Sequence, residues 1–319
     1  MFVVIGSTTA DLLVVSPESL TGSAKDGFQA GNLVFTDTPT RLSMGGNGGN
    51  SAYVFAGLGL PTALCSSVGQ EALGNTLVDW LEARGVNLDG LTRSDTHATS
   101  TSVILMTDAS NQFVFHHLGA TACIRSEDLP KSLIDEADVL LATSYPIVPN
   151  MRAGGFARAI ARAHRSGAIT ALDIGPSIGD PVTLDEITPL LPVTHYLIAN
   201  THEIGRLMGK EDWETAASRL LDAGVQNLVV KRDEAGTSLR GRGANVDVPA
   251  FTVSAVVSVG AGDAFNAGFL YGVKQGLPPK QAVRFGNAVA ALVVGSEQGV
   301  MGSPTLEQVE AFLADHGDG

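Results

Sequence analysis

Apolar runs alternate with helix-patterned segments along most of this chain. The apolar runs lie at 62–69, 138–144, 168–175, 195–200 and 226–231. Segments with apolar residues at helical spacing lie between them, at 75–85, 153–167, 201–209 and around 216–221, and a further short helix is expected to end near residue 191. Nearly continuous apolar strands separated by helices are typical of a parallel sheet covered on both faces. The pattern predicts an α/β fold with a doubly wound, mostly parallel sheet flanked by helices.

Two regions pair strand-like runs without a helix between them. We expect these strands at about 11–16, 32–38, 100–107 and 111–118, with a hairpin turn in "TDASNQ". They would form a small β-sheet lid, because open doubly wound sheets bind ligands at the carboxyl ends of their strands. No repeat or low-complexity linker divides the chain. Residues 1–319 are therefore predicted to form a single domain with inserted lid strands.

Two histidines stand side by side in the last of these lid strands. Neighbouring residues of a strand face opposite sides, so His116 and His117 cannot easily bind one metal ion together. One of them should face solvent, and the other could contact a substrate under the lid. We assign the substrate side to His117.

Composition and charge narrow the class of protein. The chain has 319 residues and a formal net charge of −13, which makes nucleic acid or an anionic membrane an unsuitable partner. Its two cysteines, Cys65 and Cys123, are too far apart in sequence for a CxxC metal site and too few for a disulfide framework. No apolar run reaches the length of a membrane span, and no basic segment precedes the apolar N-terminus. These features predict a soluble, cytoplasmic protein.

The segment "SVGAGDAFNAGF" places three small residues directly before a carboxylate. Gly260, Ala261 and Gly262 let the backbone approach a ligand, and the helix expected over 264–275 directs its free N–H groups at that ligand. This arrangement suits a transferring phosphoryl group, with Asp263 accepting a proton from the attacking hydroxyl. The alternative is a glycine turn in which Asp263 only caps the helix.

A second glycine-rich segment, "SMGGNGGNSAYVFAGLG", precedes another predicted helix. One tight turn needs one or two glycines, whereas "GGNGGN" within this segment holds four, interleaved with Asn47 and Asn50. Asparagine offers both a donor and an acceptor, which matches a hydroxyl group. The segment is therefore predicted to wrap around a polar ligand, and a flexible surface loop is the alternative.

The two glycine-rich segments resemble the signatures of the ribokinase-like, phosphofructokinase-B-type carbohydrate kinases. "GGNGGN" and "GAGDAFNAGF" stand in the family's order and at its spacing, with the NxxE motif "NTHE" between them. The resemblance extends over nearly the whole chain. "GSTTADLLV" is similar to the family's first strand with its substrate-binding aspartate, and "NAVAALVVG" to the helix that lines the adenine pocket. It implies a ribokinase-like fold whose β lid often forms a dimer interface.

The resemblance also implies an activity and the roles of individual residues. The reaction would be ATP-dependent phosphoryl transfer to a sugar-type hydroxyl. Asp263 would be the general base, with an anion hole from the amides of Gly260, Ala261 and Gly262. Mg²⁺ bound with ATP would be positioned, mainly through water, by Asn200 and Glu203. The substrate would be held by Asp11, Gly45, Gly46 and Asn50, beside Asn47 and His117, which are assigned to the substrate above. The nucleotide would be held by Lys231, Gly236 and Asn287.

The sequence departs from the family pattern at three places. The family usually has Asp-Thr-x before GAGD, and the aspartate helps to bind an activating monovalent cation in many relatives. Here Val257 stands at that position, so potassium activation is expected to be weak or absent. The family often has lysine where Asn47 stands. Asp233 occupies the place of a glycine that usually precedes Gly236 in the nucleotide site.

Other functions remain open from the sequence. "GPSIG", at 175–179, matches the GxSxG motif of serine hydrolases, although Pro176 and Pro181 fit poorly with the strand–turn–helix that the motif needs. The chain could also be a nucleoside kinase of the same fold, or a catalytically silent protein that senses a sugar or nucleotide. "GGNGGN" contains no lysine or arginine, which favours an unphosphorylated sugar or sugar acid as substrate.

Overall fold

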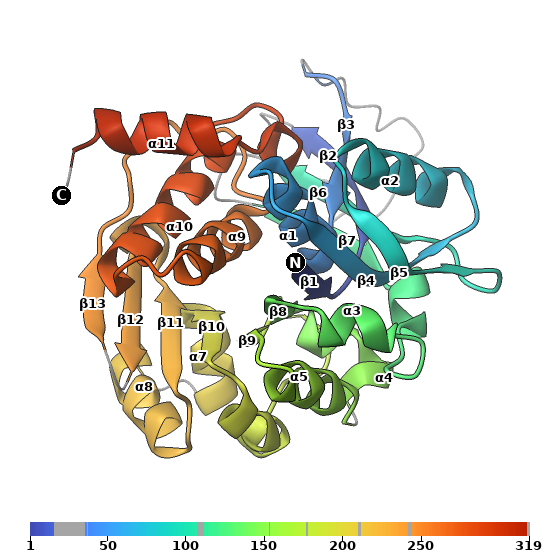
Figure 1. Ribbon diagram of the computed structural model, residues 1–319. Helices are drawn as coiled ribbons and strands as arrows, with labels where there is room; N and C mark the ends of the chain where they lie inside the picture. The colour runs from blue at the N-terminus through green and yellow to red at the C-terminus, as the bar shows by residue number, and fades with distance from the viewer. Residues whose placement is uncertain are drawn as a thin grey trace, which may run out of the picture.

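The predicted apolar runs form neighbouring strands of one nine-stranded sheet in the computed structural model (Figure 1). The structure describes residues 1–15, 36, 38–106, 112–152, 154–176, 178–209, 212–241 and 244–317. In spatial order the strands are β13 (Asn245–Val248), β12 (Thr237–Gly241), β11 (Asn227–Lys231), β10 (Tyr196–Asn200), β9 (Ile169–Asp173), β8 (Val139–Ala142), β1 (Phe2–Ile5), β4 (Thr62–Gly69) and β5 (Asn87–Ser94).

In this spatial order, the strands from β11 through β1 to β5 all run parallel. At the other end of this sheet, β12 and β13 are antiparallel to their neighbours. Parallel strands need a crossover connection, and helices supply most of these connections here. The carboxyl ends of the parallel strands therefore lie along the same edge of the sheet. The predicted mostly parallel architecture is confirmed.

Both faces of the sheet are buried because successive side chains of each strand point to opposite sides. In β1, Val3 and Ile5 belong to one core cluster, whereas Phe2 and Val4 belong to the other. This is why β1 and β8 are apolar at every position and show no alternation with polar residues.

Two groups of helices cover these faces (Figure 1). One face carries α1 (Asn47–Gly57), α2 (Ala72–Ala83), α9 (Ala261–Lys274), α10 (Pro279–Val294) and α11 (Leu306–Asp315). The other carries α3 (Lys131–Asp135), α4 (Pro149–Arg152), α5 (Gly155–Arg165), α6 (Leu184–Ile187), α7 (Thr201–Met208) and α8 (Trp213–Asp222). Short 3₁₀ turns are η1 (Gly119–Cys123), η2 (Tyr145–Ile147), η3 (Thr188–Val193), η4 (Asp233–Ala235) and η5 (Gly299–Gly302). Among the described helices, none has the length and apolar character that crossing a membrane requires.

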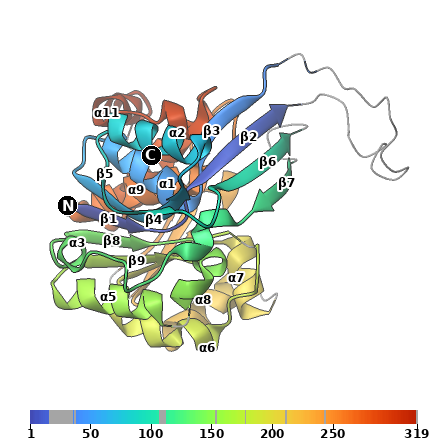
Figure 2. The ribbon, with the colours of Figure 1, turned by 90° about the vertical axis from the view of Figure 1, so that its right-hand side faces the viewer.

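A separate four-stranded sheet projects from the side of the main body (Figure 2). Its order is β3 (Arg41–Gly45), β2 (Thr9–Val15), β6 (Ser100–Met106) and β7 (Gln112–His117), and we call it the lid. β6 alternates regularly between half-buried and buried residues, as a sheet with one covered face should. Leu13, Ile104 and Met106 form a small apolar cluster on the covered face, and Val259 packs against it.

The strand next to β2 is not where the sequence places it. Of the predicted strand 32–38, only residues 36 and 38 lie in the described part, and the predicted turn at 107–112 lies almost entirely outside it. β3 instead begins at Arg41 and extends through Gly45, into the segment that the sequence suggests is a loop around a ligand. The glycine-rich segment is thus shared between a strand and the helix α1.

Candidate active site

Polar residues end three neighbouring strands at the carboxyl edge of the main sheet. Asp173 ends β9, Asn200 ends β10 and Lys231 ends β11. Since these strands are adjacent and parallel, the three side chains lie at one edge, where doubly wound sheets bind ligands. The helix α9 begins beside this edge, because a Cβ atom on Gly262 would lie only 3.2 Å from the Lys231 Nζ atom.

Small residues at the start of α9 are required by both conformation and space. Gly260 adopts a left-handed φ of 83°, and a Cβ atom there would lie 2.2 Å from the Val300 side chain. No side chain caps the helix, so its N-terminal end and positive dipole face the sheet edge directly. The amide of Ala261 donates to the Ser258 carbonyl at 3.3 Å, so one of the three amides expected in the anion hole already has a partner.

Asp263 lies in the first turn of α9 and is only 3% exposed. Asn47 Nδ2 donates to its Oδ1 at 2.9 Å, and Asn50 Nδ2 donates to its Oδ2 at 2.8 Å. Both donors come from α1, three residues apart, which places them on the same helix face. The N-cap of α9 is Gly260, so the alternative in which Asp263 merely caps the helix is wrong.

Burial and hydrogen bonding act in opposite directions on Asp263. Burial raises the pKa of its carboxyl group to about 6, and the hydrogen bonds from Asn47 and Asn50 limit that rise. The negative charge of Asp173 raises this pKa further, whereas Lys231 lowers it. A carboxylate with a pKa just below neutrality is still ionised at pH 7 and accepts a proton more readily than an ordinary aspartate.

The two asparagines contact the carboxylate rather than standing free in a loop. The remaining oxygen of Asn50, Oδ1, is buried and has no hydrogen-bond partner within the described residues. The Oδ1 atom of Asn47 accepts from Ser144 Oγ at 3.5 Å, and Ser144 in turn lies 2.8 Å from Ser7 Oγ. Ser144 has a left-handed φ of 62°, which is unusual for serine. No sequence signal marked Ser7 or Ser144.

The glycines around these asparagines allow α1 to approach the first strand closely. A Cβ atom on Gly48 would lie 2.6 Å from the backbone of Gly6, and one on Gly45 would lie 2.1 Å from the Asp11 carboxyl group. Gly46, with a left-handed φ of 77°, lies between the end of β3 and the start of α1. The expectation of a loop is therefore wrong, because the segment is a strand followed by a helix and these glycines allow close packing of backbone and carboxylate. Its contact with a ligand stays a prediction.

Asp11, on the lid strand β2, is a second buried carboxylate in this region. Burial raises the pKa of Asp11 to about 7, a hydrogen bond from Ser102 lowers it, and the charge of Asp263 raises it. Its Oδ1 atom is buried without a hydrogen-bond partner in the described part of the chain. Asp11 and Asn50 thus each present a buried acceptor that a ligand hydroxyl could satisfy.

The assignment of His117 to the substrate side does not agree with the structure. Asp11 pairs with Ser102, and Ser102 pairs with His116, so these three residues share a face of the lid. His117 pairs with Thr101 on the opposite face and is exposed. The rule that neighbours face opposite sides holds, but the sequence could not show which face was covered.

A buried cluster around Asp173 was not anticipated. Asp173 is 2% exposed, and its Oδ2 atom accepts from Lys231 Nζ at 3.1 Å and from the side-chain Nδ2 of Asn266. Burial alone would lower the pKa of Lys231, but the carboxylates of Asp173, Glu203 and Asp263 outweigh it and raise this pKa. A signal was present, since "AITALDIG" is an apolar run with an acidic residue near its carboxyl end.

Asn200 and Glu203 form a capping box at the start of α7. The Glu203 amide donates to Asn200 Oδ1 at 2.8 Å, and the Asn200 amide donates to Glu203 Oε2 at 2.8 Å. Glu203 is only 7% exposed, and its pKa is raised by burial while Lys231 lowers it. Three or more close metal-binding side chains occur nowhere in the described residues. That Asn200 and Glu203 position Mg²⁺ mainly through water stays a prediction.

The residues expected at the nucleotide differ in what they contact. Asn287 accepts from Thr237 Oγ1 at 2.8 Å and donates to the carbonyls of Val248 and Pro249 at 3.3 and 3.0 Å. Its amide thus joins α10 to the β12–β13 hairpin. Glycine is required at position 236 for two reasons. Its φ is positive, at 87°, and a Cβ atom there would lie 2.1 Å from the Val248 carbonyl oxygen.

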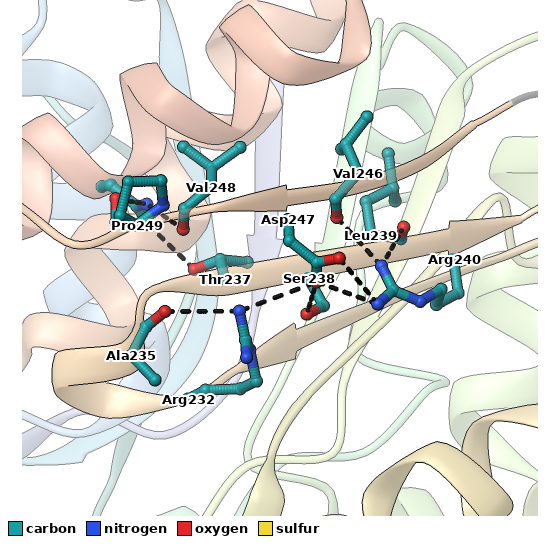
Figure 3. Close-up of polar contacts among 11 residues, drawn as sticks. Arg232, Ala235, Thr237, Ser238, Leu239, Arg240, Val246, Asp247, Val248 and Pro249 are labelled. Carbon is teal, nitrogen blue, oxygen red and sulfur yellow. Dashed lines mark hydrogen bonds and ion pairs between the residues drawn. The ribbon is translucent and has the colours of Figure 1, made fainter. Parts of the chain in front are cut away.

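Charged side chains brace the same hairpin (Figure 3). Arg240 contacts both carboxylate oxygens of Asp247, at 2.9 and 3.0 Å, and Arg232 approaches Asp247 at 3.6 Å. Asp233, which stands where the family usually has glycine, adopts a left-handed φ of 50°. Aspartate tolerates this conformation better than most residues, so the turn keeps its shape without glycine.

Two other sequence features have clear structural outcomes. Val257 is 7% exposed, and a Cβ atom on Gly299 would lie 3.4 Å from its side chain, so an apolar group fills this position. In the GxSxG match at 175–179, the serine lies outside the described residues. Between Asp173 and Leu184 no helix occurs in the described positions, so the strand–turn–helix of a hydrolase nucleophile is missing there.

Comparisons with known proteins place the chain among kinases. Residues 1–306 match the family model described as pfkB family carbohydrate kinase. An ATP-dependent ribose-1-phosphate kinase of Halopiger xanaduensis is 30% identical over 279 residues, which cover 87% of this chain and 89% of that protein. A nucleoside kinase of Methanothermobacter thermautotrophicus is 30% identical over 275 residues, which cover 86% of this chain and 85% of that protein.

The fold comparison agrees with the sequence comparison. The structure of Arabidopsis thaliana ribokinase complexed with ribose and ATP matches with a TM-score of 0.81 and 23% identity, covering 98% of this chain and 97% of that one. The predicted ribokinase-like sheet with a β lid is confirmed by this likeness. The hydrolase alternative has no support in it.

Proposed function

This chain belongs to the pfkB family of carbohydrate kinases, and from that premise we propose that it phosphorylates a hydroxyl of an unphosphorylated sugar or sugar-like substrate, with Asp263 as general base. It is an ATP-dependent kinase. The observation that carries the proposal is the buried Asp263 carboxylate, held by two amide donors at the uncapped start of α9.

Asp263 takes the proton of the acceptor hydroxyl as that oxygen attacks the γ-phosphorus of ATP. A new P–O bond forms, the bond from the γ-phosphorus to the β,γ-bridging oxygen breaks, and the electron pair leaves with ADP. Charge that develops on the transferring group is stabilised by the N-terminal amides of α9 and by Lys231, which lies against Gly262. Asp173 keeps the Lys231 ammonium in place through its 3.1 Å contact.

We place Mg²⁺, bound with ATP, near Asn200 and Glu203. The support is that Glu203 is a buried carboxylate close enough to Lys231, Asp173 and Asp263 to interact with their charges. Mg²⁺ neutralises phosphate charge when it is bound and usually keeps several water ligands. A Glu203→Gln variant should weaken the dependence on magnesium more than the affinity for the sugar. An unchanged magnesium midpoint together with an unchanged kcat would remove Glu203 from this role.

The acceptor is best described as a neutral molecule with several hydroxyl groups. Asp11 and Asn50 each offer a buried oxygen that needs a donor, and a carboxylate at Asp11 repels an anionic group. A nucleoside is the alternative of the same fold, because a nucleoside kinase is 30% identical to this chain. A ribose-1-phosphate kinase is equally similar, so sugar phosphates belong in the test as well.

A panel of sugars, sugar acids, nucleosides and sugar phosphates, assayed for ADP release, tests the proposal. We expect turnover of one or more neutral polyhydroxy acceptors and little turnover of sugar phosphates. The competing proposal is a catalytically silent protein that only senses its ligand. A ligand that binds in calorimetry but yields no ADP at any magnesium concentration would support that proposal against ours.

We further propose a homodimer formed through the outer face of the lid. Leu42, Leu12, Val103 and Phe115 pair in register across all four strands on that face, and Phe115 is 58% exposed. Phe113 contacts Phe115 edge to face, at 5.0 Å between ring centroids. A second copy of the same sheet offers a matching apolar surface. Phe115→Asp should give a monomer in sedimentation velocity, and a wild-type monomer would contradict the proposal.

Cytoplasmic location and the lack of nucleic-acid or membrane partners stay predictions from composition.

A further inference from the structure

A row of four polar residues crosses the covered face of the lid. Ser43 pairs with Asp11, Asp11 with Ser102, and Ser102 with His116, so one residue from each strand stands at the same level. Residues in register across a sheet share a face. The next row on this face holds Leu13 and Ile104, which are buried and apolar. The row on the other side holds Thr9 and Ser100, which are buried and polar, so the polar row borders the apolar cluster.

Two members of this row, Ser102 and His116, are linked by a hydrogen bond. His116 Nδ1 lies 3.1 Å from Ser102 Oγ, and Ser102, which pairs with Asp11 across the strands, lowers the pKa of the Asp11 carboxyl group. A serine hydroxyl has one proton to donate, and an ionised carboxylate can only accept. When Ser102 donates to Asp11, it must accept from the Nδ1–H group of His116. This arrangement fixes the tautomer of a neutral His116 and leaves its Nε2 atom as an acceptor.

The acceptor that this arrangement creates has no partner of its own. His116 Nε2 is buried and makes no hydrogen bond within the described residues, and the same is true of Asp11 Oδ1. Buried polar atoms are normally paired, because leaving one unpaired is costly. Two unpaired acceptors on one row of the lid therefore indicate a ligand that brings donors to this face.

We propose that His116 is a specificity-determining residue of the lid, whose Nε2 atom accepts a hydrogen bond from a substrate hydroxyl other than the one that Asp263 deprotonates. Ser102 is the positioning residue that orients the His116 ring. The proposal rests on the proposed kinase function and extends it. It commits to a substrate that presents hydroxyl donors to the lid.

The charge state of His116 agrees with an acceptor role. Burial lowers its pKa, and the neighbouring charge of His117 lowers it further. The titratable group on the same face of the lid is Asp11, across Ser102, whereas His117 is the neighbour of His116 on β7 and lies on the opposite face. A neutral imidazole beside a carboxylate gives no attraction to an anion, so a hydroxyl is preferred to a phosphate at this position.

His117 supplies a matched control for the experiment. It has the same side chain, lies one residue away on the same strand, and faces the opposite side of the lid. His116→Phe keeps an aromatic ring but removes both nitrogens. His116→Gln keeps a polar atom near the position of Nε2. His117→Phe and His117→Gln should show any effect that comes only from changing the surface of β7.

The experiment compares kcat and KM for the sugar or nucleoside that the panel identifies, such as D-ribose or adenosine, and for its monodeoxy analogues. We expect His116→Phe to lower kcat/KM at least about tenfold for the parent substrate. For the analogue that lacks the recognised hydroxyl, His116→Phe should cause little further loss. His116→Gln should recover part of the difference, and His117→Phe should act like the wild type. Thermal unfolding midpoints show whether each variant is folded.

Two results would overturn the inference. One is a His116→Phe enzyme whose kcat/KM stays within about twofold of the wild type. The other is a loss of equal size for the parent substrate and for every deoxy analogue, which would assign His116 a structural role only. Failure of the proposed function has a different signature, since the wild type would then phosphorylate no member of the panel. Calorimetric binding of the same probes to the wild type and to His116→Phe decides the question in that case, and equal affinities would reject the inference.

Discussion

At the scale of single residues, the position of Asp263 depends on groups from distant parts of the chain. Asn47 and Asn50 each donate to one of its carboxylate oxygens, from more than 200 positions earlier in the sequence. The carboxylate itself could be predicted from the GAGD turn, because its place at a helix start suggested a base. Its donors could not, since an asparagine in a glycine-rich segment suits a substrate hydroxyl just as well. Asp173 and Ser144 were missed because only the tertiary fold brings them to the site.

Removing the Asn47 donor should shift the pH dependence of turnover. The hydrogen bond from Asn47 lowers the pKa of Asp263, which burial raises to about 6. A general base must be ionised, so kcat of the wild type should fall as the pH drops through about 6. In Asn47→Ala the pKa rises further, and the acid limb of the kcat–pH profile should move to higher pH. An acid limb at the wild-type position, with the same maximum, would show that Asn47 does not act on the base.

Val257 leads to a prediction about potassium. A hard cation needs several oxygen ligands, and a buried valine supplies none from its side chain. We expect weak or no activation when kcat in potassium chloride is compared with kcat in a bulky organic cation at equal ionic strength. Stimulation of about tenfold or more, which corresponds to about 1.4 kcal/mol in the barrier, would mean that the ion site persists without the aspartate.

At the scale of elements, two units define the site: the first turn of α9 and the lid. The residues before Asp263 are small because Gly260 needs its left-handed conformation and Gly262 lies against Lys231. The lid could be predicted as paired strands without helices. The boundary of β3 could not, because glycines ordinarily indicate a loop, and only the close approach of Gly45 to Asp11 explains why glycine stands in a strand here.

Closure of the lid should protect ATP from water. The apolar cluster of Leu13, Ile104 and Met106 packs on Val259, directly before the turn that begins α9. A site closed in this way excludes water from the γ-phosphate. We expect ADP release without an acceptor to be very slow compared with release in the presence of an accepted sugar. Equal rates with and without the acceptor would contradict closure and the kinase mechanism together.

At the scale of the whole molecule, the parallel sheet gathers the reacting groups. The alternation of apolar runs with helices predicts a doubly wound sheet and its ligand edge. The pattern does not give the spatial order of the strands, so it could not show that β9, β10 and β11 bring Asp173, Asn200 and Lys231 together. That residues 1–319 form one domain stays a prediction, and its support is that both core clusters share one sheet.

The central claim is that Asp263 is the base for phosphoryl transfer, and Asp263→Asn tests it most directly. We expect kcat to fall by about 10²–10⁴, the contribution of a positioned base, while calorimetry shows ATP and sugar affinities close to those of the wild type. Asp315→Asn, at the exposed end of α11, is the matched control and should keep full activity. If Asp263→Asn instead retains more than about a tenth of the wild-type kcat, Asp263 is not the base.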